Sequence, residues 1–420
     1  MPVPSAPAVL DPATAGDDRS AGSRLKLVLV LGSLIALGPL TIDMYLPALP
    51  SIPADLETTE AAVQLTLTGT LLGIALGQLL VGPLSDAYGR RRPLLAGVAV
   101  HVVASLLCFV APTVEVLGGL RLLQGLGAAA ASVTAMAVVR DLYTGNAAAV
   151  LLSRLMLILG AAPVLAPTLG GQVLRHTDWR GVFLVLAAAG LAVMGVAARS
   201  LEETLSPHRR RSGRVGGTLR TYRSLFRDRA FVGLILVAGL AMAAIFAYVS
   251  GSPFVFQEQY GLDEQEFGLL FGAGAFGLIG STQLNPVLLR RWQPQQLLVT
   301  ALVIGVVCSA VLLLTALTGA GGLVGLLLPL WAVLSAVGLA MPHTPALALT
   351  RHGEAAGTAA ALLGATQFGL AALIAPCVGL LGNDARAMAL VVAATMAGAL
   401  AVLLLVVQPG RLVIDQATRS

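Results

Sequence analysis

Charged residues are scarce in this chain of 420 residues: they make up 11%, against 57% hydrophobic residues and a mean hydropathy of +0.86. Soluble domains carry about 25% charged residues, so this composition excludes a soluble globule. Lysine is almost missing, because Lys26 is the one lysine among 26 basic residues. The net charge of +5 does not indicate a nucleic-acid partner, since most arginines lie in loops expected on one side of a membrane.

Cysteine and metal-ligand patterns are also sparse. Cys108, Cys308 and Cys377 all fall inside apolar runs, which is typical of small buried hydrophobic residues and predicts neither a disulfide nor a metal site. His101 and His343 each stand alone in an apolar run, without a second ligand at metal spacing, and we interpret both as structural. No Walker loop or nucleophile elbow occurs, so we expect neither an enzyme nor ATP-driven transport, and no cofactor.

Long apolar runs are what the chain has in abundance. Each is about the length that crosses a hydrocarbon core, and only helices satisfy the backbone of such runs in lipid. We therefore predict an all-α integral membrane protein with twelve transmembrane helices. The predicted spans are 25–49, 61–84, 93–111, 115–139, 147–173, 180–199, 230–256, 265–289, 295–317, 323–345, 356–380 and 387–408.

Arginine placement orients these spans. Arginine-rich loops stay in the cytoplasm, and the loops that would then be outside hold only Arg175, Arg180 and Arg386. Both termini are therefore expected in the cytoplasm, and the basic linker is expected to rest on anionic lipid headgroups. The expected organisation is a disordered tail at 1–24, a six-helix bundle at 25–199, a basic cytoplasmic linker at 200–229, a second six-helix bundle at 230–408 and a tail at 409–420.

The loop between the second and third spans carries a long motif. Gly82-Pro-Leu-Ser-Asp-Ala-Tyr-Gly-Arg-Arg-Arg92 resembles the corresponding loop of the major facilitator superfamily, and Asn285 to Arg291 repeats it faintly after span eight. The resemblance implies two six-helix bundles around a central cavity. It also implies a latch at the cytoplasmic ends of the bundles, which we assign to Asp86, Arg90, Arg91, Arg140 and Asp141.

Two ionisable residues lie inside predicted spans, where a charge costs at least about 2.5–3.5 kcal/mol. Asp43 lies in the outer half of the first span, and Arg121 lies near the outer end of the fourth. Because the two helices run in opposite directions, both residues fall in a similar membrane layer. We interpret them as a proton-coupling site; the alternative is a structural charge pair.

The sequence around these residues resembles one branch of the superfamily. Arg121-x-x-Gln124-Gly resembles the fourth-helix motif of proton-coupled facilitators. The fifth span resembles the antiporter motif through four residues, although Ala166 replaces a usual glycine: Pro163, Pro167, Gly170 and Gly171. The stretch after Asp43 and the pair Arg140-Asp141 are similar to the bicyclomycin and chloramphenicol resistance (Bcr/CflA) branch of the drug:proton antiporters.

That resemblance implies proton-coupled efflux of a small amphipathic drug, similar to chloramphenicol, florfenicol or bicyclomycin, across the bacterial cytoplasmic (inner) membrane. The proton gradient would supply the energy, and we expect a monomer. Five neutral polar residues are candidates for the substrate cavity: Tyr45, Gln64, Gln124, Tyr248 and Gln367. A metabolite or sugar transporter on the same fold is the alternative, but an aromatic content of only 5% favours an apolar substrate. A second alternative, a sensor that moves no substrate, fits poorly with the intact motifs.

Overall fold

The computed structural model describes residues 21–210, 215–350 and 355–408. Most of the tail expected at 1–24 and all of that expected at 409–420 lie outside these ranges. Within the described ranges, twelve stretches are long and apolar enough to cross a membrane, which confirms the predicted number of spans. The regular structure described is entirely helical, as the sequence predicts.

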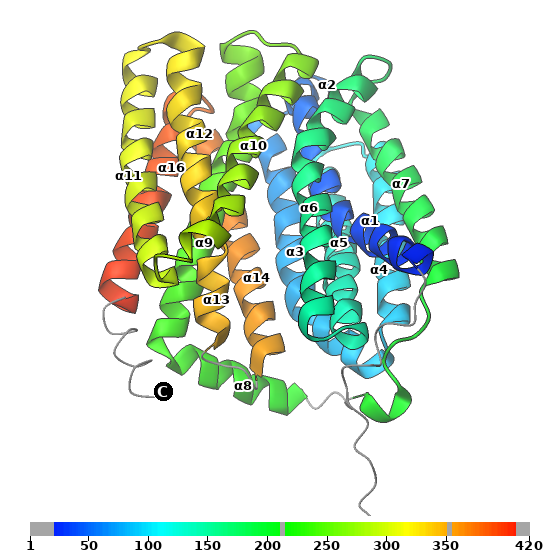
Figure 1. The fold of residues 1–420 in the computed structure, drawn as a ribbon. Helices are drawn as coiled ribbons and strands as arrows, with labels where there is room; N and C mark the ends of the chain where they lie inside the picture. Colours follow the sequence, from blue (N-terminus) through cyan, green and yellow to red (C-terminus); the bar gives the residue numbers. More distant parts are fainter. Residues whose placement is uncertain (1–20, 211–214, 351–354, 409–420) are drawn as a thin grey trace, which may run out of the picture.

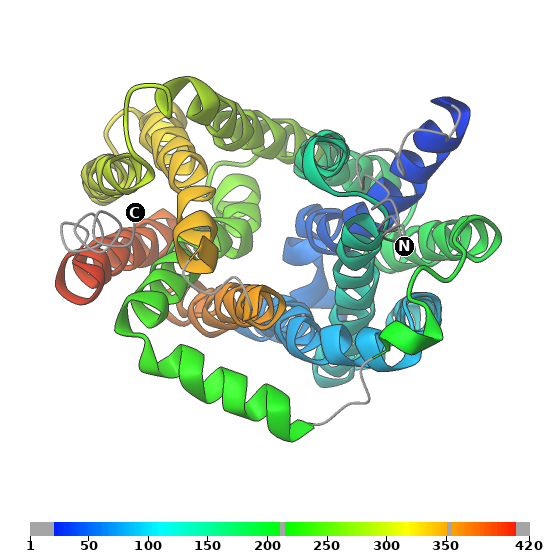
Figure 2. The ribbon, with the colours of Figure 1, turned by 60° about the horizontal axis from the view of Figure 1, so that its bottom comes forward.

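The first half of the chain forms six spans that pack mainly on one another (Figures 1 and 2). Their helices are α1 (Ala21–Asp43), η1 (Leu46–Ser51), α2 (Ile52–Asp55), α3 (Glu60–Tyr88), α4 (Arg91–Phe109), α5 (Val114–Leu142), α6 (Gly145–Leu174) and α7 (Trp179–Ser200). We call this group the N-terminal bundle.

The second half forms the other six spans, which we call the C-terminal bundle. Its helices are α9 (Arg229–Pro253), η3 (Phe254–Gln259), α10 (Glu264–Leu288), α11 (Pro294–Thr318), α12 (Gly322–Ala340), α13 (His343–Thr350), α14 (Ala356–Ile374), α15 (Cys377–Leu380), α16 (Ala385–Val402) and η5 (Leu403–Val407). The two bundles meet along α3 with α14 and along α6 with α10.

The first span is not the single helix over 25–49 that the sequence predicts. The α-helix α1 ends at Asp43, and the chain continues as the 3₁₀ helix η1 and the short helix α2. Proline has no backbone N–H and its ring crowds the carbonyl four residues earlier. Pro47 therefore removes the donor that the carbonyl of Asp43 would need, and α1 ends at this residue.

Close packing of α3 on α5 depends on glycine. Gly69, Gly73 and Gly77 follow one another at four-residue spacing on α3, and a Cβ at any of them would collide with α5. At Gly73 the collision would be with the backbone carbonyl of Leu122. Small residues at this spacing let membrane helices approach closely, and here they hold α5 where Arg121 faces α1.

The two ends of the molecule differ. The turn between α3 and α4 and the helix α8 (Val215–Arg227) lie at one end, which we call the basic end; α2 lies at the other, the opposite end (Figure 1). Asn383 bonds to Glu60 at the start of α3, on the side of α3 away from the basic end. Helix α8 forms within the segment 200–229 that the sequence predicts as a linker. It lies across the basic end and contacts α9 and α14.

Candidate functional site

Asp43 is the last residue of α1 and is almost completely buried, with 6% of its surface exposed. Among the described residues it has no hydrogen-bonding or ion-pair partner, and Tyr248 of the C-terminal bundle lies within its electrostatic reach. The next residue, Met44, exposes its carbonyl to Gly170 of α6, where a Cβ would collide with that oxygen. Asp43 thus ends α1 within electrostatic reach of the C-terminal bundle, and among the described residues its carboxyl group has no counterion.

Arg121 of α5 is completely buried, at 0% exposed, and its bond to Thr41 lies two residues before Asp43 along α1. Its Nη1 donates to the backbone carbonyl of Thr41 at 3.0 Å and to Oε1 of Gln124 at 2.5 Å. However, Arg121 and Asp43 do not form an ion pair. Among the described residues, Nε and Nη2 of Arg121 have no hydrogen-bond acceptor. The guanidinium of arginine is not deprotonated in proteins. The site therefore holds a buried cation with two unused hydrogen-bond donors.

Aromatic rings cover the rest of the guanidinium. Its central carbon lies 4.4 Å from the ring centroid of Tyr45 and 5.7 Å from that of Phe183. Cation–π contacts of this kind stabilise a desolvated cation by about 2 kcal/mol. The hydroxyl of Tyr45 in turn bonds to Thr66 of α3 at 3.0 Å. The site around Arg121 is therefore tied to α1, α3 and α7 as well as to its own helix.

A chain of hydrogen bonds continues from Arg121 into α4. Gln124 Nε2 donates to Ser105 Oγ at 2.7 Å, and Ser105 Oγ donates to the backbone carbonyl of His101 at 2.7 Å. The His101 ring returns to α1, with Nε2 2.8 Å from Thr41 Oγ1. Nothing local in the sequence links these positions, which explains why Thr41 and Ser105 are absent from the predicted site and His101 is predicted to be a lone structural residue.

A second charged cluster lies at the basic end. Arg90 pairs with Asp86 (Nη1 to Oδ1, 2.6 Å) and with Asp141 at the end of α5 (Nε to Oδ2, 2.9 Å). Burial alone would lower the pKa of the Arg90 guanidinium, but the hydrogen bonds to Asp141 and Asp86 outweigh this and raise the pKa. The cation of Arg90 is thus fully compensated by two carboxylates.

The side chains of the remaining residues assigned to the latch do not pair with Asp86 or Asp141. Arg91 donates through Nη2 to the carbonyl of Ala198 at 2.7 Å, and Arg140 is exposed. The cluster itself belongs to the N-terminal bundle alone, since Asp86, Arg90 and Asp141 contact one another across α3, the start of α4 and α5. Its role as a latch between bundles stays a prediction.

Glu203, which follows α7, joins the cluster and was missed by the sequence argument. Its carboxylate accepts the backbone N–H of Arg90 at 2.8 Å and of Arg91 at 3.2 Å. The slight burial of the Glu203 carboxylate would raise its pKa, but these bonds outweigh that effect and hold the pKa below its usual value. Gly89 lets the carboxylate approach: its φ of 90° and ψ of 169° belong to a glycine-only region, and a Cβ there would collide with Glu203.

Hydrogen bonds join the two bundles at the opposite end. Gln64 Nε2 donates to the carbonyl of Ser250 at 3.1 Å and to Asn383 Oδ1 at 2.5 Å. Asn383 Nδ2 donates to Glu60 at 2.6 Å, and Gln257 Nε2 donates to the carbonyl of Pro47 at 3.2 Å. Within the part of the chain that the structure describes, every hydrogen bond between the bundles lies at this end. Among the described residues, the two bundles are therefore joined by hydrogen bonds at the opposite end and not at the basic end.

Two of the antiporter-motif residues, Pro167 and Gly171, pack against α10. Helix α6 runs through Pro163 and Pro167 without ending. Gly171 faces the backbone of Glu264 at the start of α10, as Gly170 faces the backbone of Met44. A side chain at either glycine would separate the helices. The motif thus places the C-terminal bundle and the end of α1 against the same turn of α6.

The residues predicted to line a substrate cavity are not equivalent in this state. Tyr45, Gln64 and Gln124 are buried and bond to neighbouring helices. Tyr248 stacks on Phe271 at 5.1 Å between ring centroids, and its hydroxyl has no partner among the described residues. Gln367 is half-buried. Whether they bind substrate stays a prediction, for which Tyr248 and Gln367 have polar groups not used in packing.

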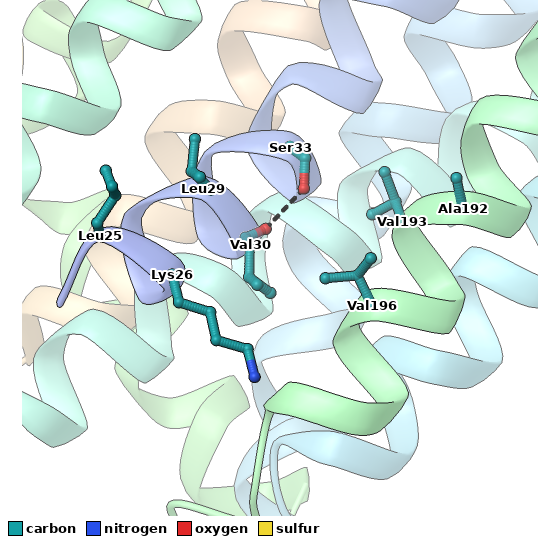
Figure 3. A pocket seen from close by; sticks show the side chains of 8 residues that line it. All are labelled: Leu25, Lys26, Leu29, Val30, Ser33, Ala192, Val193 and Val196. Atoms are coloured by element: carbon teal, nitrogen blue, oxygen red, sulfur yellow. Dashed lines mark hydrogen bonds between the residues drawn. The ribbon is translucent and has the colours of Figure 1, made fainter. Parts of the chain in front are cut away.

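A separate groove opens away from these residues, between α1 and α7 (Figure 3). Its volume is about 580 Å³, and aliphatic side chains such as Leu29 and Val196 make up most of its lining, with Lys26 near one edge. The groove contains none of the candidate coupling or cavity residues, so we do not assign the substrate site to it.

Comparison with known proteins gives a consistent family. The family model described as "Major Facilitator Superfamily" matches residues 31–376. An "Uncharacterized MFS-type transporter YdgK" of Bacillus subtilis is 38% identical over 85% of this chain and 89% of its own length. A "Chloramphenicol resistance protein" of Pseudomonas aeruginosa is 33% identical over 80% of this chain and 79% of its own length.

A more distant relative and a solved structure agree with this. A "Bicyclomycin resistance protein homolog" of Haemophilus influenzae is 29% identical over 86% of this chain and 90% of its own length. Among solved structures, a D-xylose–proton symporter superposes with a TM-score of 0.73 and covers 93% of this chain and 99% of its own. At 17% identity this second likeness concerns the fold alone.

Proposed function

This chain belongs to the major facilitator superfamily, a family of membrane transporters and not of enzymes, and from that premise we propose that it exports a small amphipathic drug in exchange for protons. The drug class is suggested by relatives named for bicyclomycin, chloramphenicol and multidrug resistance. Export would follow alternating access, with the two bundles opening first at one end and then at the other.

The observation that carries the proposal is Asp43. A carboxylate with 6% of its surface exposed and no described hydrogen-bonding partner is costly as an ion, so burial favours the protonated acid. Asp43 is also at the break between α1 and η1, where the backbone can adjust. A carboxyl group at such a place can take up a proton in one state of the transporter and release it in the other.

Arg121 supplies the second half of the mechanism. Its two unused donors, Nε and Nη2, are on the helix that already contacts α1 at Thr41. When Asp43 loses its proton, a shift of the end of α1 would let the carboxylate accept these donors. The deprotonated site would then be an ion pair and the protonated site the separated arrangement seen here. Proton release is thereby linked to a movement of α1.

The proposed orientation places the basic end in the cytoplasm of a bacterium, with both termini on that side. The arginines of α8 and of the turn after α3 support it, because cytoplasmic loops carry an excess of basic residues. In that orientation the present state, fastened at the opposite end, faces the cytoplasm and is ready to accept drug. Lipid headgroups would contact α8, and a monomer is sufficient for the cycle.

Asp43→Asn tests the proposal directly. We expect the variant to insert normally and to lose drug-driven proton movement across everted vesicles, because an amide cannot carry the proton. Chloramphenicol, florfenicol and bicyclomycin are the probes, and a pH-sensitive dye reports proton movement. Asp43→Glu should keep part of the activity, since the acid is preserved.

Asp55→Asn is the matched control, because Asp55 ends the same span but pairs with Arg180. It should transport like the unmodified protein. Proton-driven export that is undiminished in Asp43→Asn would exclude Asp43 as the proton carrier. If the drugs move no protons but pentoses or other metabolites do, the alternative of a metabolite or sugar transporter replaces drug efflux.

A further inference from the structure

His101 is the one buried histidine of α4 and lies at the centre of the N-terminal bundle, with 0% of its surface exposed. Its Nε2 is 2.8 Å from Thr41 Oγ1. The hydroxyl hydrogen of Thr41 is directed to the carbonyl of Leu37 at 2.6 Å, and a hydroxyl has only one hydrogen to donate. The hydrogen between His101 and Thr41 therefore belongs to Nε2 of the imidazole, which donates.

The other ring nitrogen confirms the same assignment. Nδ1 of His101 has no partner among the described residues and faces Gly190 of α7, where a Cβ would lie 3.2 Å from it. A nitrogen without a hydrogen is the form that needs no acceptor there. Arg121 is the charged group that acts on the ring, and a second positive charge beside it would be unfavourable. The ring is thus held as a single-donor imidazole.

Thr41 receives contacts at both of its polar ends. His101 holds the side chain, while Arg121 holds the backbone carbonyl at 3.0 Å. Carbonyls in the last turn of a helix lack an intrahelical donor, and a cation at that end is favourable. The carbonyl of Thr41 is therefore available to Arg121 because α1 ends two residues later, at Asp43.

We propose that His101 is a positioning residue that fixes the end of α1 against Arg121 through Thr41. The role rests on the proposed function in one respect: it matters for transport only if Asp43 is the proton carrier. The imidazole keeps the Thr41 carbonyl within reach of Nη1 and so leaves Nε and Nη2 for Asp43. Without it, the end of α1 loses one of the two hydrogen bonds that, among the described residues, join it to α4 and α5.

A purely space-filling role for His101 leads to a different prediction from a positioning role. In that case an apolar side chain of similar size would serve, whereas a positioning residue must donate from the place of Nε2. Glutamine has an N–H donor at about the same distance from its backbone as Nε2, and leucine has none. His101→Gln and His101→Leu therefore separate the two roles. His343→Leu, a buried histidine in the C-terminal bundle, is the matched control.

Hydrogen exchange of the purified full-length protein in lipid nanodiscs tests the positioning itself, without any assumption about substrate. We expect backbone amides between Ile42 and Leu46 to exchange about tenfold faster in His101→Leu, because a lost buried hydrogen bond raises the population of local openings by about that factor. His101→Gln and His343→Leu should leave these amides unchanged. Equal exchange in His101→Leu and the unmodified protein would overturn the proposal, as would a failure of glutamine to restore protection.

Proton-coupled transport in the same variants distinguishes this proposal from the function on which it rests. If exchange changes as expected and drug-driven proton movement falls in His101→Leu but not in His101→Gln, both stand. If exchange changes as expected but no variant, the unmodified protein included, moves protons with drug, the positioning role stands and the proposed function fails. Thr41→Val should reproduce the His101→Leu exchange pattern, and the double variant should show no further increase.

Discussion

The protein holds two buried or half-buried arginines in opposite ways. Arg90 at the basic end contacts two carboxylates and bonds to Ser85 as well, so its charge is balanced. Arg121 in the membrane layer has carbonyl and amide oxygens and two aromatic rings, and no carboxylate among the described residues. The ion pairs of Arg90 stabilise the present structure. Arg121 has no such pair here, so a state in which it contacts a carboxylate would be more favourable for its charge.

The difference also concerns what each site connects. The Arg90 cluster lies within one bundle and is completed by Glu203 from the segment after α7. The Arg121 site lies where α1 ends and touches the helix that carries Asp43. We infer that the first site sets the preference for one state of the transporter, and the second makes that preference depend on a proton.

Replacing Arg121 should have the largest effect on transport. Arg121→Ala leaves the Thr41 carbonyl and Gln124 without their donor, and bonds from a charged donor contribute about 1.5–3 kcal/mol each. Loss of both corresponds to a decrease of roughly a hundredfold or more in drug-driven proton movement. Arg121→Lys should retain more activity, because the charge stays. Normal transport by Arg121→Ala, at matched protein levels, would mean that the buried arginine is not coupled to the cycle.

Replacing Arg90 should have a smaller effect of a different kind. Arg90→Ala and Asp86→Ala should slow turnover and leave drug affinity unchanged, since both lie far from Asp43. A latch that contributes about 1.4 kcal/mol changes the ratio of the two states tenfold. Labelling of a cysteine introduced at Ser250, a buried position whose backbone carbonyl joins the bundles at the opposite end, should decrease in these variants. Weaker drug binding with unchanged labelling would contradict the latch.

The features that the sequence predicts depend on neighbouring residues or on position along the chain. The length of the apolar runs predicts the twelve spans, and the opposite directions of the first and fourth spans predict that Asp43 and Arg121 lie in a similar membrane layer. The contact of Asp86 with Arg90 joins residues four apart at the end of a helix, a separation at which side chains meet. Pro47, which ends α1 at Asp43, is also visible in the sequence, although the argument took the span through it.

The missed contacts depend on how the helices pack. Thr41 and His101 are 60 residues apart, Glu203 and Arg90 are 113 apart, and Gln64 and Asn383 are 319 apart. A lone histidine or glutamine in an apolar run gives no sign of its partner. The absence of an ion pair between Asp43 and Arg121 could not be predicted either, because depth fixes the layer of a side chain but not its direction around the helix.

Gly89 gives a third and smaller effect, on stability. Gly89→Ala must adopt a glycine-only backbone conformation, which costs about 1–3 kcal/mol, and its Cβ would push away the carboxylate of Glu203. We expect lower thermal stability, measured by exposure of the buried thiol of Cys108 to a fluorogenic maleimide. Gly82→Ala, in the same motif but with open space around the Cβ, is the control and should be neutral. Equal loss in both would show that Glu203 does not need the glycine.

Glu203 gives the smallest effect, and its sign follows from its pKa. Hydrogen bonds from the Arg90 and Arg91 amides favour the carboxylate and hold its pKa below the ordinary 4.5. Such a group stabilises the folded state above its unfolded pKa, and this contribution is lost as the pH falls through the folded pKa. Glu203→Gln should therefore be less stable than the unmodified protein at pH 7, and the difference should shrink below about pH 4.5. The side chain is exposed, so solvent screening keeps the effect small. Thermal denaturation at pH 7 and pH 4 measures it, with Glu202→Gln, an exposed neighbour, as the control; a difference that grows toward acid would contradict the assignment.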